Sequence, residues 1–173
     1  TTYESDVDPL RRFLMEKSIN SQMKITGVAE QKNSIVRFTN PTILPCDTSP
    51  KFVIASIDIE TGAKTNQLYS IAVHITGKNG EHKKVFMIGE KPKRDSELIS
   101  FYNDERELLT NFFVWFKQID PDIIIGWHVI GFDLLFLDNK CRELGISLDI
   151  ARANGRVSIR QRKPSGHFIS ITG

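Results

Sequence analysis

The chain has 173 residues, with 23 lysines and arginines against 21 aspartates and glutamates, and 40% of its residues are hydrophobic. This composition is typical of a soluble globular protein and excludes disordered, collagen-like and membrane-spanning classes. The two cysteines, Cys46 and Cys141, lie far apart, which argues against a disulfide framework or a structural zinc site. We therefore expect a cytoplasmic protein without membrane association.

The first fifty residues predict a small α+β unit. Asp8 followed by Pro9 is a favourable helix start, and the apolar residues after it predict a helix through about Ile19. Two strands are expected next, at residues 23–29 and 34–39, joined by a polar turn at residues 30–33. Prolines at 41, 45 and 50 then predict a linker.

From Lys51 onward the pattern is that of an α/β domain, so we expect one unit at 1–50 and a second at 51–173. Runs rich in β-branched residues predict three antiparallel strands, the last two joined by a glycine-containing turn: residues 52–60, 68–76 and 83–88. Apolar residues at helical spacing predict a buried helix that begins at Asn103-Asp104 and ends before Asp120.

The continuous apolar run at 123–127 predicts a strand covered on both faces and parallel to its neighbour. A second helix is expected at about 133–144, ending at Gly145. The order β-β-β-α-β-α, with the first and fourth strands side by side and parallel, is typical of a mixed-sheet, ribonuclease H-like α/β domain.

The end of the chain predicts a basic hairpin at residues 157–171. Residues 151–173 contain five of the 23 basic residues and no acid, so the remainder has 18 basic against 21 acidic residues, a charge of −3. A polyanion is one partner for this tail, and a solvated surface hairpin is the alternative.

Two carboxylates share one face of the first strand of the main domain. Side chains alternate along a strand, so Asp58 and Glu60 point to the side opposite Ile57 and Ile59. Ionised acids near a buried strand need a compensating charge, and oxygen ligands favour Mg²⁺ or Mn²⁺. The alternative is that both acids simply reach solvent at the strand end.

A third acid, Asp133, follows the fourth strand. If that strand is parallel to the first, Asp133 comes to the same sheet edge as Asp58 and Glu60. Three converging carboxylates suit two-metal catalysis of phosphodiester cleavage. The alternative for Asp133 alone is a helix N-cap.

These residues resemble the exonuclease motifs of family B DNA polymerases: residues 58–61 the first motif, and residues 120–127 leading to Phe132-Asp133 the second. Residues 9–17 are similar to the stretch before the exonuclease domain in bacterial members of that family. The resemblance implies part of a DNA-directed DNA polymerase that acts in DNA replication and repair and carries a 3′-to-5′ proofreading exonuclease.

The resemblance also implies roles for single residues. Asp58, Glu60 and Asp133 would be the catalytic metal ligands of a two-metal Mg²⁺ or Mn²⁺ site, and Thr61 and Phe132 would lie near the 3′-terminal nucleotide. His128 stands where the family usually has asparagine, so it either contacts the primer end or packs as a loop histidine under Phe132.

The family's third motif, a tyrosine followed four residues later by an aspartate, is absent from these residues, so we expect an inactive N-terminal fragment with an incomplete exonuclease domain at 51–173. The basic hairpin would contact DNA phosphates through its cationic side chains: Arg160, Arg162 and Lys163. The expected partners are a single-stranded 3′ end and primer–template DNA, with a sliding clamp as a partner of the parent protein.

Two other functions remain open at this point. A stand-alone ribonuclease H-like nuclease would act on RNA and would need its last acid within the chain. A non-catalytic nucleic-acid-binding module would use only the unequal distribution of charge. Metal-dependent cleavage would distinguish either nuclease from the binding module. A preference for DNA over RNA would distinguish the polymerase exonuclease from the ribonuclease.

Overall fold

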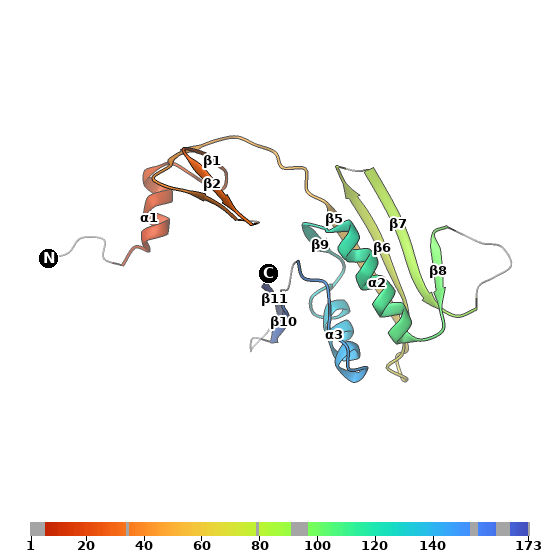
Figure 1. Cartoon of the computed structure of the whole chain (residues 1–173). Helices are drawn as coiled ribbons and strands as arrows, with labels where there is room; N and C mark the ends of the chain where they lie inside the picture. The colour runs from red at the N-terminus through yellow and green to blue at the C-terminus, as the bar shows by residue number, and fades with distance from the viewer. Residues whose placement is uncertain are drawn as a thin grey trace. The chain divides into compact units, whose positions relative to one another are not determined.

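The structure is a computed structural model, and it describes residues 6–33, 35–78, 80–90, 97–152, 156–161 and 167–172. The chain divides into two compact units, Thr1–Pro50 and Lys51–Gly173 (Figure 1). Each unit is described by itself below.

Within its described residues, the N-terminal unit contains one helix and two pairs of short antiparallel strands. Helix α1 (Pro9–Glu16) begins as expected, because the Asp8 carboxylate caps it by accepting hydrogen bonds of 3.0 Å from the N–H groups of Leu10 and Arg11. The strands are β1 (Met23–Thr26), β2 (Ala29–Lys32), β3 (Ile35–Phe38) and β4 (Thr42–Pro45). Strand β1 pairs with β4, and β2 pairs with β3.

Three predictions for this unit are wrong. The expected strand at 23–29 is divided at Gly27, which has a φ of +156° and whose Cβ position would lie 3.3 Å from Pro41. The residues expected to form a turn at 30–33 largely belong to β2, and the expected linker contains β4. Pro45 does not break this strand because β4 pairs with β1 alone, and proline is tolerated in edge strands.

The second unit is built on a five-stranded mixed sheet with the order β8-β7-β6-β5-β9. The strands are β5 (Ile54–Thr61), β6 (Leu68–Gly77), β7 (Gly80–Ile88), β8 (Ile99–Tyr102) and β9 (Ile123–Ile125). Strands β5, β6 and β7 form the predicted antiparallel meander, and β9 is parallel to β5. The adjacent, parallel placement of the first and fourth predicted strands is therefore confirmed.

Two features of the sheet differ from prediction. Strand β8, parallel to β7, was not expected, and its four residues are all half-buried. Strand β9 is an edge strand, and Ile123 and Ile125 are 38% and 48% exposed, so the prediction that both its faces are covered is wrong.

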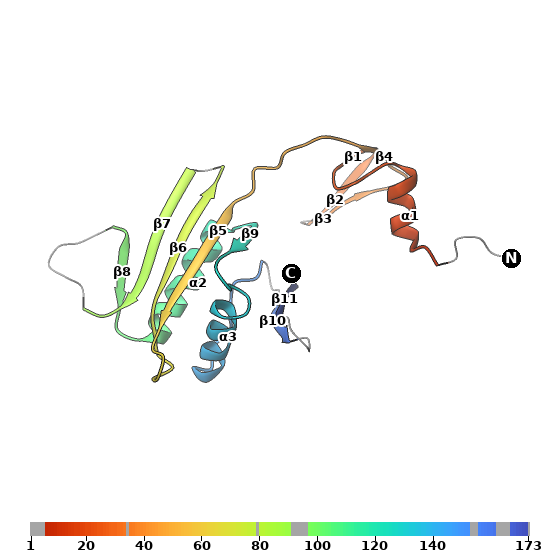
Figure 2. The ribbon, with the colours of Figure 1, turned by 180° about the vertical axis from the view of Figure 1, so that it is seen from behind.

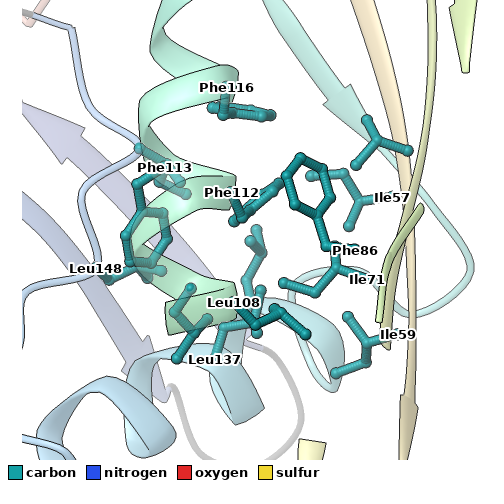
Figure 3. Packing of buried hydrophobic residues seen from close by; sticks show 14 of the residues in the cluster. Ile57, Ile59, Ile71, Phe86, Leu108, Phe112, Phe113, Phe116, Leu137 and Leu148 are labelled. Carbon is teal, nitrogen blue, oxygen red and sulfur yellow. The ribbon is translucent and has the colours of Figure 1, made fainter. Parts of the chain in front are cut away.

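Helix α2 (Glu105–Ile119) covers one face of this sheet (Figure 1). The Asp104 side chain caps it, and the phenylalanines on its buried face pack against the sheet. The ring of Phe112 lies edge-on to that of Phe86, with centroids 5.5 Å apart, beside Ile57 and Ile71 of the strands (Figure 3). Burying each such side chain contributes about 1.5–3 kcal/mol, so this layer holds the unit together.

Helix α3 (Asp133–Glu143) joins the same hydrophobic core through Leu134 and Leu137, and it ends before Gly145, which has a φ of +65°. Both helices were predicted within a residue or two. Seen from behind, α2 lies beyond the strands, and the opposite face of β5, β6 and β7 is turned to the viewer (Figure 2). That opposite face carries the acidic side chains of β5.

The end of the chain forms an antiparallel pair, β10 (Arg156–Gln161) with β11 (His167–Thr172), as predicted. Arg160 lies on β10, but the structure does not describe its side chain. Arg162 and Lys163 fall outside the described residues. Among the described residues, no helix combines the length and the apolar composition needed to cross a membrane.

Candidate active site

The first part of the site is the second half of β5. Ile57 and Ile59 are 1% and 6% exposed and face the core, whereas the intervening Asp58 and the following Glu60 are exposed. Asp58 lies opposite Ala72 and Glu60 opposite Ser70 in the ladder with β6. A shift in register between Glu60 and Thr61 marks a β-bulge, a feature common beside active sites because it redirects side chains.

The second part of the site is Asp133, the first residue of α3. It is 1% exposed, and neither of its carboxylate oxygens has a hydrogen-bond partner among the described residues. The N-cap position belongs to Phe132, and no side chain caps the helix there. The N-cap alternative for Asp133 is therefore wrong, and a buried, unpartnered carboxylate remains to be explained.

The groups around Asp133 shift the pKa of its carboxyl. Burial raises the pKa of the Asp133 carboxyl, and the charge of Asp58 raises it further, while His128 acts in the opposite direction. The backbone N–H of Ile59 also acts against the shift, although it does not reach hydrogen-bonding geometry. Asp133 is thus close enough to Asp58 and to the middle of β5 for their charges and dipoles to act on it.

The path of the chain explains how Asp133 reaches this place. The parallel ladder pairs Ile54 with Ile123 and Ser56 with Ile125, after which the chain leaves the sheet at Gly126. A Cβ atom on Gly126 would lie 2.5 Å from the Ile57 carbonyl oxygen, so only glycine allows this approach. The chain therefore lies directly against β5 at Gly126, seven residues before Asp133.

An ion-pair cluster fixes the start of this arrangement. The Asp122 carboxylate accepts a hydrogen bond of 2.8 Å from the Val53 N–H, just before β5. Arg152 donates to Asp120 at 2.6 Å and to Asp122 at 2.7 Å. Because the Asp122 N–H also donates to the Val53 carbonyl at 2.7 Å, the beginnings of β5 and β9 are held in register.

The remaining predicted residues lie around the same loop. Thr61 is half-buried at the end of β5, and Phe132 is 49% exposed. His128 is exposed with a φ of +56°, a region in which histidine and asparagine are enriched. Its ring lies 6.3 Å from that of Trp127, and the Phe132 ring lies 6.4 Å from that of Phe136.

Sequence reasoning missed Trp127 as a site residue, because it was assigned to a buried strand. Its side chain is 87% exposed. The signal that would have found it is its position directly after the glycine that ends the strand. An indole exposed to this extent beside His128 is a candidate contact for a planar ligand such as a nucleobase.

The chemistry of the acids fits a divalent cation, although they do not form a closed cage. Within the described ranges, no three His, Cys, Asp or Glu side chains form a group able to hold a metal ion as they stand. Asp133 nevertheless places two unpartnered oxygens in a buried position, where a cation would compensate their charge. A cavity of about 270 Å³ lies beside Asp58 on the exposed sheet face, lined also by Ser56 and His74.

Comparison with known proteins defines the class. A family model for the exonuclease domain of DNA polymerase family B matches residues 1–170, so the chain belongs to this family. The predicted family and the predicted mixed α/β architecture are thereby confirmed.

Individual relatives agree with this assignment. DNA polymerase II of Escherichia coli is 32% identical over 165 residues, covering 93% of this chain and 20% of that protein. A DNA polymerase of Archaeoglobus fulgidus is 25% identical over 164 residues, with the same two shares. The family B DNA polymerase structure from Pyrobaculum calidifontis shares the fold, with a TM-score of 0.62 at 20% identity over 90% of this chain and 20% of that chain. The chain thus spans about a fifth of the length of these relatives.

Proposed function

We propose that this chain carries part of a metal-dependent 3′-to-5′ exonuclease site that removes nucleotides from the 3′ end of DNA in a family B DNA polymerase. The observation that carries the proposal is the buried, unpartnered carboxylate of Asp133 beside Asp58. Membership of the family and the names of the relatives, all DNA polymerases, support DNA as the substrate.

The finer fold assignment is part of the same proposal. The order of the elements from β5 to α3, with β5 and β9 adjacent and parallel, supports a ribonuclease H-like exonuclease domain within residues 51–173. Residues 1–50 are the N-terminal part that precedes this domain in the polymerase. The compact units found on either side of Pro50 support this division.

Mg²⁺ or Mn²⁺ would be held by Asp58, Glu60 and Asp133, whose hard oxygen atoms suit both ions. When bound, the ions supply a hydroxide nucleophile and stabilise the charge that develops on the phosphate and on the leaving oxygen. Asp58 and Glu60 face solvent on β5, where the substrate would approach, whereas Asp133 is buried at the start of α3.

The other residues of the site orient DNA. Phe132 and His128 border Asp133 and would contact the 3′-terminal nucleotide, together with Thr61 at the β-bulge. The basic residues of the hairpin would contact phosphates, which position DNA without reading its sequence: Arg160, Arg162 and Lys163. A sliding clamp and a cytoplasmic location belong to the proposal for the whole polymerase.

We infer that these 173 residues cleave DNA slowly or not at all by themselves. The last acidic residue in the sequence is Asp149, so residues 150–173 add no carboxylate to the site. Binding is therefore a better test of the site than turnover.

The proposal is tested by measuring the affinity of the chain for labelled single-stranded DNA, and for RNA of the same sequence, with and without Mn²⁺. We expect Mn²⁺ to strengthen DNA binding, and Asp58→Asn to abolish this effect. Asp149→Asn, which changes an exposed acid paired with Lys117 at 2.5 Å, is the matched control and should bind as the unmodified chain does.

Two results would contradict the proposal. A preference for RNA would favour a ribonuclease, and binding that is independent of both Mn²⁺ and Asp58 would favour a non-catalytic binding module. Rapid removal of 3′ nucleotides that is lost in Asp58→Ala would contradict only the inference of low activity.

A further inference from the structure

A buried ion pair lies at the far end of the face of α3 that begins with Asp133. Lys140 is 3% exposed, and its Nζ lies 3.2 Å from Oε1 of Glu105 and 3.1 Å from Oε2 of Glu143. The ammonium group also lies 6.0 Å from the centre of the Phe136 ring. A lysine that is buried with two carboxylate partners is rare, because each ion must give up its hydration.

Both partners of Lys140 reach the turn that follows β5. The Glu105 carboxylate accepts a hydrogen bond of 2.6 Å from the N–H of Leu68, the first residue of β6. The Glu143 carboxylate accepts one of 3.3 Å from Asn66, which lies between β5 and β6. Lys140 therefore links α3 to the first turn of α2 and to the segment that comes directly after the acids of β5.

Asp133 and Lys140 occupy the same face of α3. They are seven residues apart, which is about two helical turns and roughly 10 Å along the axis, and both side chains are buried. Asp133 lies near the middle of β5 at the first turn of the helix, and Lys140 near the last turn is linked through Glu105 and Glu143 to residues beyond the end of β5. The helix is thus attached to one strand and its following turn at two points.

We propose that Lys140 is a positioning residue that, through Glu105 and Glu143, sets the place of Asp133 beside β5. The proposal rests on the proposed function, since it takes Asp133 to be one of the site acids. Lys140 contacts neither substrate nor metal; it acts through the rigid helix that carries both residues. Burial opposes the charge of Lys140, but the two carboxylates outweigh this and raise its pKa, so the link is charged at neutral pH.

The energetics of buried ion pairs favour a positioning role for Lys140 over a stabilising one. Replacing a buried pair by uncharged groups of similar size is often neutral for stability, because the cost of removing both ions from water offsets their attraction. An apolar side chain at position 140 would fill the same space without fixing the distance to Glu105. The directional contacts of the ammonium group do fix it.

The test uses the double variant Lys140→Met with Glu105→Gln, because removing one partner alone leaves a buried unpaired charge and endangers folding. The glutamine retains an oxygen acceptor for the Leu68 N–H. The matched control is Lys117→Met, which removes the 2.5 Å ion pair of Lys117 with Asp149; both side chains are exposed, so no charge is left buried.

Amide hydrogen exchange, measured by NMR, reports how firmly the first turn of α3 is held in place. The Leu134 N–H donates to the Val129 carbonyl at 2.8 Å, and the Phe136 N–H donates to the Phe132 carbonyl at 2.7 Å. We expect both amides to exchange at least about tenfold faster in the double variant, while Phe112 of α2 is unchanged. The control should leave all three within about twofold.

The proposal is overturned if exchange at Leu134 and Phe136 is unchanged in the double variant, or if it accelerates together with Phe112, which would mean general destabilisation. Mn²⁺ affinity gives a second readout: the double variant should lower it about tenfold, and should have no further effect in an Asp133→Ala background. If the unmodified chain does not bind Mn²⁺, the proposed metal site fails, but the exchange experiment still decides the role of Lys140.

Discussion

Gly126→Ala tests the path by which the chain brings Asp133 to β5. The added Cβ atom would lie 2.5 Å from the Ile57 carbonyl oxygen, and 3.1 Å from Cβ of Val129. Because real Cβ atoms essentially never approach closer than 3.0 Å, the loop and β5 must separate by at least 0.5 Å, the difference between the two distances. A backbone oxygen within a sheet cannot rotate away as a flexible side chain would.

Overpacking of this kind costs about 1–3 kcal/mol of unfolding free energy. Asp133 lies seven residues after Gly126, so the same displacement should weaken Mn²⁺ binding about 10–100-fold, as changes around metal ligands typically do. Urea denaturation measures the first effect, and calorimetric titration with Mn²⁺ measures the second.

Gly145→Ala provides the matched control. Gly145 has a φ of +65° and open space around its Cβ position, so alanine there costs about 1–2 kcal/mol of backbone strain without any overlap. It follows the end of α3 opposite to Asp133. If both variants lose similar stability and Gly126→Ala retains full Mn²⁺ affinity, the reasoning that this glycine places the site is refuted.

Three further predictions concern charge, core and surface. Asp133→Asn should be more stable than the unmodified chain at neutral pH in the presence of a chelator, because burial raises the pKa of this carboxyl in the folded state. In the unmodified chain, ionisation of the buried carboxyl lowers the free energy of unfolding increasingly as the pH rises from about 3.9 through the folded pKa. Urea denaturation midpoints measured from pH 4 to 8 give the difference. Phe112→Ala removes a fully buried ring and should cost about 3–5 kcal/mol in urea denaturation, against less than about 0.5 kcal/mol for Val114→Ala, which is 56% exposed on the same helix. Trp127→Ala should leave stability within about 0.5 kcal/mol but weaken single-stranded DNA binding by about 1–3 kcal/mol in fluorescence anisotropy, since an exposed indole can stack on a base.

Each of these predictions has a contradicting result. A stability difference between Asp133→Asn and the unmodified chain that does not change with pH would show that burial does not perturb the carboxyl. Equal effects of Phe112→Ala and Val114→Ala would remove the hydrophobic layer of α2 from the account. Unchanged DNA affinity in Trp127→Ala would assign the exposed indole another role.

The sequence predicted those parts of the fold that depend on local patterns. The meander and both helices of the second unit follow from alternation, helical spacing and caps such as Asp104, and the pairing of β5 with β9 follows from the order of the elements. The sequence failed to predict distant pairings that this order does not indicate. Strand β4 lies between prolines but pairs with β1, and β9 is apolar yet lies at a sheet edge.

The candidate site shows the same division. Alternation alone placed Asp58 and Glu60 on one face, and spacing along the chain suggested Asp133. No sequence pattern could show that Asp133 is buried without a partner, or that Lys140 is buried with two. These facts depend on how α3 packs against β5 and α2, which brings together residues that are far apart in the chain.

Anomalous X-ray diffraction from crystals of the chain soaked in Mn²⁺ tests the central claim most directly, because it locates the cation itself. We predict an anomalous peak within coordination distance of Asp58 and Asp133, about 2.0–2.3 Å from their oxygen atoms, that is absent in Asp58→Asn. An Mn²⁺ ion bound elsewhere, with the Asp133 carboxylate still buried and without a partner, would contradict the account.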